Sequence, residues 1–133
     1  MKIEIMTLFP EMCEAVLGGS IVGRARKAGK IEVHCRQIRD CSTDKHRRVD
    51  DNPYGGGMGM VMQCQPIYDC YNAVCEELGS KPHTIYMSPK GAVFTQERAI
   101  ELSKMDNILI LCGHYEGVDQ RVIDKIVDEE ISI

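Results

Sequence analysis

The chain has 133 residues, of which 44% are hydrophobic and 27% are charged, and its formal net charge is −4 at pH 7. These values predict one globular domain with a single core, and they argue against a general nucleic-acid binder. No apolar run approaches the roughly 20 residues that cross a membrane, so no membrane span is expected.

The first elements expected along the chain are two strands and two helices. Isoleucines alternate over residues 3–8 and predict a strand, and Pro10 suits the first turn of a helix that runs to Gly18. A second helix is expected over residues 21–28, and alternation over 31–35 predicts a second strand.

Residues 39–61 differ from the rest of the chain because they are polar, charged and rich in glycine, without a clear period. We expect a long loop there, and such a loop inside a compact domain is usually functional. Pro66 then opens a helix whose apolar residues recur at spacings of three and four until Gly79 ends it.

The C-terminal half alternates between strands and helices. A third strand is expected over residues 84–87, followed by a turn at Ser88–Gly91. The remaining expected elements are a helix from Thr95 to Lys104, a strand from Asn107 to Cys112, a helix over 118–126 and a fifth strand that begins at Ile131. This alternation predicts an α/β fold, a parallel sheet with flanking helices.

Seven cysteines are scattered along the chain without a Cys-x-x-Cys pair. This pattern is typical of buried free thiols in a reducing compartment, and it lacks the short paired spacing of zinc ligands. The N-terminus also lacks the apolar run of a signal peptide. We therefore expect a cytoplasmic protein without a metal site.

Two basic runs, Arg24–Lys30 and Lys45–Arg48, contrast with the acidic balance of the chain. The first puts four positive charges into seven residues, and the second lies just before a pair of aspartates. Either run can contact phosphates or lie on a solvated surface, and charge alone does not decide between these alternatives.

A dense group of glycines follows Asp50 and Asp51, with four glycines within residues 55–59. Because glycine costs more backbone entropy than any other residue when ordered, the group indicates positive φ angles or close approach of another molecule. A phosphate-binding loop is disfavoured because the Gly-Lys-Ser/Thr ending is absent and no strand directly precedes the glycines.

A second informative stretch follows the apolar run 108–111. It puts Gly113, Tyr115 and Glu116 at the carboxyl end of a predicted buried strand, and Tyr86–Pro89 end the neighbouring strand. Ligands of open α/β sheets bind outside such strand ends, so both loops can line one crevice.

Both stretches resemble the bacterial tRNA (guanine-N1)-methyltransferase family, commonly called TrmD. The family pattern Arg-x-Val-Asp-Asp-x-Pro-Tyr-Gly-Gly-Gly-x-Gly-Met matches residues 47–60, and Cys-Gly-Arg-Tyr-Glu-Gly matches residues 112–117 except that His114 replaces arginine. Because imidazole is shorter than guanidinium and usually neutral at pH 7, a charge contact there is expected to be weaker. Further matches at Leu8–Met12, Tyr86, Ser88–Pro89 and Asp128–Ile133 extend the resemblance from end to end.

The resemblance implies a SPOUT-type methyltransferase fold with a deep trefoil knot, incomplete in this chain, and a homodimer with the active site at the subunit interface. It implies methyl transfer from S-adenosylmethionine to N1 of the guanosine 3′ of the anticodon in tRNA, and it allows a requirement for Mg²⁺. Residues 1–133 would be the N-terminal portion of the methyltransferase domain, without the C-terminal tRNA-binding domain. The family's general base is an aspartate expected after residue 133, so this portion alone is expected to be inactive.

The resemblance also implies which residues form the site. Cofactor contacts are expected from Tyr86, Met87, Ser88, Pro89, Gly113, Tyr115, Glu116, Ser132 and Ile133. Contacts to the RNA are expected from Asp50, Asp51, Tyr54, Gly55, Gly56, Gly57 and Gly59. Gly113 would let the strand end approach the cofactor, and Glu116 is the candidate contact to the N1–H and N2–H₂ edge of guanine.

Each of these assignments has an alternative. Glu116 can instead be an acid at a helix N-terminus, where the helix dipole favours it, and the aspartate pair can form an Asx turn before Asn52–Pro53. For the whole protein, the alternatives are a knotted methyltransferase acting on another RNA and a catalytically inactive fragment. The stretch from Asp50 to Gly57 is specific to the guanine-N1 family and argues against another RNA.

Overall fold

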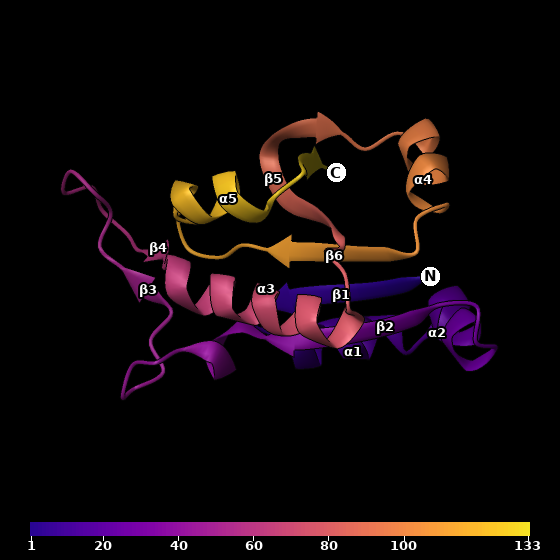
Figure 1. Cartoon of the computed structure of the whole chain (residues 1–133). Coiled ribbons are helices and arrows are strands. Elements are labelled where there is room, and N and C mark those ends of the chain that lie inside the picture. The colour runs from indigo at the N-terminus through magenta and orange to yellow at the C-terminus, as the bar shows by residue number, and fades with distance from the viewer.

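A five-stranded parallel sheet organises the chain, and the computed structural model describes every residue from 1 to 133 (Figure 1). The strands lie in the order β2-β1-β6-β5-β7, and every neighbouring pair is parallel. Their bounds are β1 Lys2–Thr7, β2 Glu32–Gln37, β5 His83–Val93, β6 Asn107–Cys112 and β7 Glu129–Ser132. The predicted α/β fold with a parallel sheet is confirmed.

Two helices, α3 (Cys64–Leu78) and α5 (Gln120–Ile126), cover the face of the sheet that holds the larger part of the core. Met6, Leu109 and Leu111 point toward them and are fully or almost fully buried. Because the opposite face is covered as well, β6 reads as a continuous apolar run rather than as an alternating strand.

The opposite face carries α1 (Pro10–Leu17), α2 (Ser20–Lys27) and α4 (Gln96–Leu102). Leu102 of α4 packs in a smaller cluster with Ile108 of β6. In contrast, α1 has no buried residue, although it is rich in apolar side chains. None of the helices has both the length and the apolar character that a membrane crossing requires.

The turn predicted at Ser88–Gly91 is wrong, because β5 continues through these residues as one bent strand. The strand pairs with β7 on both sides of the bend, so that Ile131 faces Met87 and also Ala92. A β-carbon on Gly91 would lie 2.5 Å from the carbonyl carbon of Glu130. Ser-Pro and Lys-Gly are turn formers locally, but pairing with β7 overrides that preference.

Residues 39–61 are more ordered than the predicted loop. A 3₁₀ helix, η1 (Ile38–Cys41), begins the segment, and β3 (Asp50–Asp51) pairs antiparallel with β4 (Val61–Met62). The loop between β3 and β4 therefore starts and ends at one short ladder. Several element boundaries also differ from prediction by one or more residues; for example, α3 begins at Cys64 rather than Pro66, and β7 begins at Glu129 rather than Ile131.

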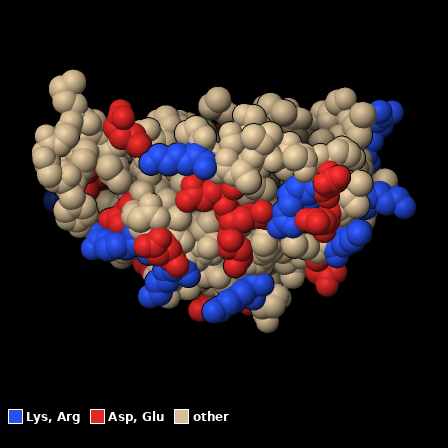
Figure 2. All heavy atoms as spheres, turned by 90° about the horizontal axis from the view of Figure 1, so that it is seen from above, with Lys and Arg blue, Asp and Glu red and all other residues tan.

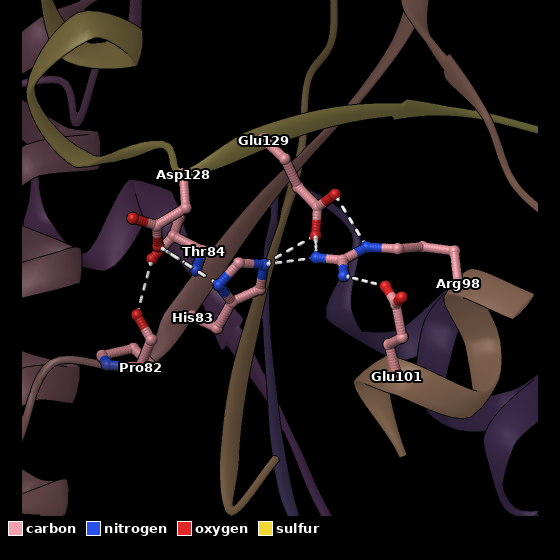
Figure 3. Close-up of polar contacts among 7 residues, drawn as sticks. All are labelled: Pro82, His83, Thr84, Arg98, Glu101, Asp128 and Glu129. Atoms are coloured by element: carbon pink, nitrogen blue, oxygen red, sulfur yellow. Dashed lines mark hydrogen bonds and ion pairs between the residues drawn. The ribbon is translucent and has the colours of Figure 1, made fainter. Parts of the chain in front are cut away.

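An ion network joins the amino ends of β5 and β7 (Figure 3). Arg98 donates from Nε and Nη2 to the two carboxylate oxygens of Glu129, at 3.0 and 2.5 Å, and His83 Nε2 lies 2.6 Å from the same carboxylate. Beside it, the backbone N–H of Thr84 donates to Asp128 at 2.7 Å. Burial raises the pKa of Glu129, but the hydrogen bonds from Arg98 and His83 outweigh it and hold that pKa below its ordinary value.

Candidate functional site

The two sequence stretches that resemble the methyltransferase family lie side by side at the carboxyl edge of the sheet. Glu116 N–H donates to the carbonyl of Met60 at 3.0 Å. Met62 then donates to the carbonyl of Gly117 at 2.9 Å and accepts from Asp119 N–H at 3.0 Å. A parallel bridge joins Met62 to Val118. The backbone thus fixes the end of the glycine-rich loop against the loop that follows β6.

Tyr86 and Gly113 meet where β6 ends beside the bend of β5. Met87 pairs with Cys112, so the residues that follow them, Ser88 and Gly113, start from the same level of the sheet. A β-carbon on Gly113 would lie 3.0 Å from the hydroxyl oxygen of Tyr86 and 3.3 Å from Cγ2 of Val118. The space beside Gly113 is therefore filled by the buried ring of Tyr86, and burial raises the pKa of that phenol.

The other residues predicted to contact a cofactor lie at the same edge with different exposure. Ser88 is buried and its hydroxyl accepts from Lys90 N–H at 3.2 Å, whereas Pro89 is exposed. The carbonyl of Ser132 accepts from Phe94 N–H at 2.8 Å, and Ile133 is exposed. The edge thus presents both apolar side chains and accessible backbone.

Three of the four glycines in the loop need glycine for conformational reasons, as the sequence predicted. Gly55, Gly56 and Gly59 have φ angles of 88°, 78° and 92°. A β-carbon on Gly59 would also lie 2.4 Å from Cγ of Glu116, whereas one on Gly57 meets only Pro53, at 3.9 Å. Close approach is therefore specific to Gly59, and its partner is the candidate catalytic carboxylate.

Glu116 is exposed and does not belong to a helix, so its alternative assignment as a helix N-terminal acid is wrong. Helix α5 begins at Gln120, and Asp119 caps it by accepting from the N–H of Arg121 at 3.0 Å. Tyr115, just before Glu116, has a φ of 60°, a strained value for a residue with a side chain. The carboxylate of Glu116 is left facing Gly59.

The aspartate pair lies in β3 at the start of the loop. Asp51 accepts from the neighbouring N–H of Asn52 at 2.7 Å, and the carbonyl of Asp50 accepts from Gln63 Nε2 at 3.0 Å. Residues 52–60 between the two strands carry no charged side chain. Figure 2 shows positive and negative charges interspersed over the face it presents, with a largely uncharged surface at the end where Figure 1 places this loop.

The basic runs are partly neutralised within the chain. Arg26 pairs with Glu14 at 2.9 Å, Arg47 pairs with Asp40, and Arg48 lies 3.5 Å from Asp44. No group of three or more His, Cys, Asp or Glu side chains is placed to hold a metal ion. Burial raises the pKa of the Cys112 thiol to about 11, so this thiol at the strand end stays protonated at neutral pH.

One part of the site was not predicted from the sequence. A pocket of about 540 Å³ lies between the glycine-rich loop and the start of α5. Arg121 on its wall donates to the hydroxyl of Tyr54 at 2.8 Å and to the carboxylate of Asp119 at 2.6 Å. Hydrogen bonds from Arg121 lower the pKa of Asp119 to about 2, against the opposing effect of its partial burial. The sequence places Asp119 and Arg121 just after the recognised stretch, but nothing in it indicates their contact with Tyr54.

His114, which replaces the arginine of the family pattern, contacts two aromatic rings. Its ring centroid lies 5.0 Å from that of Phe9 and 4.6 Å from that of Tyr115. Its backbone N–H donates to the sulfur of Met62 at 3.3 Å. The side chain at this position is thus directed toward the end of β1 and the start of α1.

Comparison with known proteins gives consistent results. A family model described as tRNA (Guanine-1)-methyltransferase TrmD matches residues 1–133. A tRNA (guanine-N(1)-)-methyltransferase of Ruminiclostridium cellulolyticum is 57% identical over 133 residues, which cover 100% of this chain and 57% of that protein. Its counterpart in Alkaliphilus metalliredigens is 53% identical over 135 residues, covering 100% and 55%.

A solved structure shares the fold at high similarity. The crystal structure of the tRNA (m1G37) methyltransferase from Aquifex aeolicus matches with a TM-score of 0.91 and 42% sequence identity, covering 100% of this chain and 59% of that one. The chain therefore spans somewhat more than half the length of the relatives it matches.

Proposed function

The chain belongs to the tRNA (guanine-1)-methyltransferase family TrmD, and from this premise we propose that the protein transfers a methyl group from S-adenosylmethionine to N1 of the guanosine 3′ of the anticodon in tRNA. The observation that carries the proposal is the contact between Gly59 and Glu116. It brings an uncharged, glycine-rich loop and an exposed carboxylate together at the edge of a parallel sheet where ligands bind.

We assign the cofactor to the end of β6 and the adjoining bend of β5. The Tyr86 ring offers an apolar wall, and the exposed residues Pro89 and Gly113 lie beside it, which together suit a purine nucleoside. When bound, S-adenosylmethionine supplies a methyl group made electrophilic by its sulfonium. Met87, Ser88, Tyr115, Ser132 and Ile133 complete the proposed contact set, with a role for Mg²⁺ left to experiment.

Glu116 is proposed to orient the guanine. Its carboxylate accepts hydrogen bonds, and guanine offers two adjacent donors, N1–H and N2–H₂, on one edge. The backbone bond from Glu116 to Met60 fixes the position from which the side chain reaches the base. Asp50, Asp51, Tyr54 and the loop glycines Gly55, Gly56 and Gly57 are proposed to contact the RNA around it. Removal of the N1 proton is assigned to a carboxylate outside residues 1–133.

A second copy of the chain is the proposed partner. Helix α1 buries no residue, and its Met12 and Val16 are 68% and 76% exposed. An isolated eight-residue helix is not stable in water, so tertiary or quaternary contacts must support it. Because Phe9 at the start of α1 contacts His114, a subunit covering α1 would lie next to the site. The proposal is thus a homodimer with the active site at the interface.

We further propose that residues 1–133 are the N-terminal portion of a knotted methyltransferase domain and that the protein acts in the cytoplasm. The second proposal is supported by the seven free cysteines and by the tRNA substrate assigned above.

The test uses the full natural chain that contains residues 1–133. Transfer of a labelled methyl group is measured to two tRNAs that differ only in carrying guanosine or adenosine 3′ of the anticodon, and the product nucleoside is identified by mass spectrometry. N1-methylguanosine from the first tRNA alone supports the proposal, and Glu116→Gln should lower the rate by about 10²-fold or more. Transfer to another RNA instead, or to both tRNAs equally, would overturn it.

A further inference from the structure

The tip of the glycine-rich loop, residues 53–59, is joined to the rest of the molecule by a single side-chain hydrogen bond. Tyr54 is 83% exposed and Met58 is 95% exposed, so burial does little to hold the tip. Its one internal backbone bond, from Gly56 N–H to the carbonyl of Pro53, is 3.3 Å long. The bond to the rest of the molecule runs from Arg121 Nη2 to the hydroxyl of Tyr54 at 2.8 Å.

Arg121 is held in the orientation that this bond requires. Its Nε donates to one carboxylate oxygen of Asp119 at 3.0 Å, and its Nη2 donates to the other at 2.6 Å. Such a two-point contact fixes the plane of a guanidinium group as well as its position. The side chain of Asp119 is only 11% exposed, and its backbone N–H is bonded to the carbonyl of Met62. The contacts that restrain Tyr54 therefore begin at Asp119, a largely buried residue that is itself hydrogen-bonded to β4.

The guanidinium also meets the aromatic face of Tyr54, with its central carbon 5.4 Å from the ring centroid. A cation over a ring face adds attraction to the hydrogen bond at the ring's edge. Both contacts restrain the same loop, and the loop ends at Gly59 against Glu116. Restraining Tyr54 thus restrains the conformation in which the loop meets the candidate catalytic carboxylate.

We propose that Asp119, Arg121 and Tyr54 form a latch that holds the glycine-rich loop in its RNA-binding conformation before RNA arrives, and that Arg121 is a positioning residue for the methyl-transfer reaction. The inference rests on the proposed function only for its link to RNA. A loop that is already in its binding conformation binds RNA without an entropy cost for ordering. If only a fraction of the molecules has that conformation, the apparent affinity for RNA falls in proportion to that fraction. The latch should therefore act on affinity for RNA and not on the chemical step.

The test compares three single variants and one double variant of the full natural chain containing residues 1–133. Arg121→Met removes the latch, Tyr54→Phe removes its hydrogen bond, and the double variant does both. Lys125→Met is the matched control, since Lys125 lies one helical turn beyond Arg121 on α5, carries the same charge and contacts Tyr68 instead of the loop. Amide hydrogen exchange of residues 53–59 is measured without RNA or cofactor, and KM and kcat are measured with tRNA.

We expect Arg121→Met to speed exchange of residues 53–59 about fivefold, the effect of losing an exposed charged contact, and to raise the KM for tRNA by a similar factor. Tyr54→Phe should do the same to a smaller extent, and the double variant should be no worse than Arg121→Met because both changes break one contact. The value of kcat and the melting temperature should stay near those of the parent. A purely structural role would lower the melting temperature and leave KM unchanged.

Unchanged exchange in Arg121→Met, or an equal KM effect in Lys125→Met, would overturn the latch. Because the exchange measurement needs neither RNA nor cofactor, it decides this point even if the protein methylates a different substrate. An active parent protein with unaltered loop exchange in Arg121→Met and Tyr54→Phe would remove the latch and leave the proposed function intact.

Discussion

A β-carbon on Gly59 would lie 2.4 Å from Cγ of Glu116, and Gly59 has a φ of 92°. Alanine at this position is therefore expected to displace the carboxylate or open the loop. Since a displacement of about 1 Å in a catalytic group costs roughly 10²-fold in rate, Gly59→Ala should lose at least that much methyl transfer. Single-turnover transfer to tRNA measures the loss, and thermal melting shows that the protein still folds.

The neighbouring glycine provides the control for this prediction. Gly57 has no positive φ, and a β-carbon there would meet only Pro53, at 3.9 Å. At saturating tRNA, where weaker RNA contact does not limit the reaction, Gly57→Ala should keep the single-turnover rate within about threefold of the parent, because its β-carbon does not reach Glu116. Equal losses in the two variants would mean that the loop is sensitive everywhere and that contact with Glu116 is not the reason.

Gly113→Val is expected to weaken binding of S-adenosylmethionine by at least about tenfold, since the added methyl groups enter the space of Tyr86 and Val118 and overpacking of this kind costs about 1–3 kcal/mol. The ring of Tyr86 would be pushed toward the proposed cofactor site. Calorimetric titration of the full natural chain measures the affinity, and circular dichroism checks the fold. Unchanged affinity in a folded variant would move the cofactor away from these strand ends.

The ion network of Figure 3 predicts a dependence of stability on acid. The pKa of Glu129 in the folded protein lies below its ordinary value of 4.5, so the folded state favours the charged carboxylate. Its contribution to stability is complete above pH 4.5 and is lost as the pH falls through the lowered pKa. Melting temperatures should therefore fall below pH 4.5, less steeply in Glu129→Gln than in the parent. The exposed Glu97→Gln is the control and should keep the parent's slope.

Amide exchange should divide the segment from residue 44 to residue 62 into two parts. Residues 52–59 have almost no backbone bonds and are restrained chiefly through Tyr54, so they should exchange faster than Met62, which donates to Gly117 and should be protected. Addition of tRNA should slow exchange in the fast part. Strong protection of residues 52–59 in the free protein would contradict this division.

Residues 1–133 expressed alone should transfer no measurable methyl group to tRNA. The reason is the assignment of the general base to a residue outside this range, since loss of such a base costs roughly 10²–10⁴-fold. The same assay with the full natural chain is the comparison. Robust transfer by residues 1–133 would place the base within them, with Glu116 and the pair Asp50 and Asp51 as the first candidates.

The sequence predicted those parts of the fold that follow from local patterns. The continuous apolar run identifies β6, because a strand that is buried on both faces is apolar throughout. The spacing of three and four identifies α3, because a helix that is buried along one stripe repeats its apolar residues with the helical period. Patterns of one segment carry no information about its partner, so the turn predicted at Ser88–Gly91 was overruled by pairing with β7. The sequence also did not predict the short ladder of β3 and β4, because strands of two residues are too short to show a hydrophobic period.

Within the site, the family pattern located the two loops, and the positive φ angles of three loop glycines were predicted from composition. The contact of Arg121 with Tyr54 joins residues 67 positions apart and was not predictable from either one. The role of Asp119 as the cap of α5 was not predicted, and the alternative that placed Glu116 at a helix N-terminus is wrong because the helix begins only at Gln120.

The double pairing of Ile131 with Met87 and Ala92 bears on how the protein is made. The bend that carries Ser88 and Pro89 is completed by β7, which is the last strand of the described chain. Domains begin to fold from the N-terminus while the ribosome is still at work, so β5 leaves the ribosome before its last partner, β7. A nascent chain that has not yet released residues 129–132 should lack this pairing, and with it part of the proposed cofactor site.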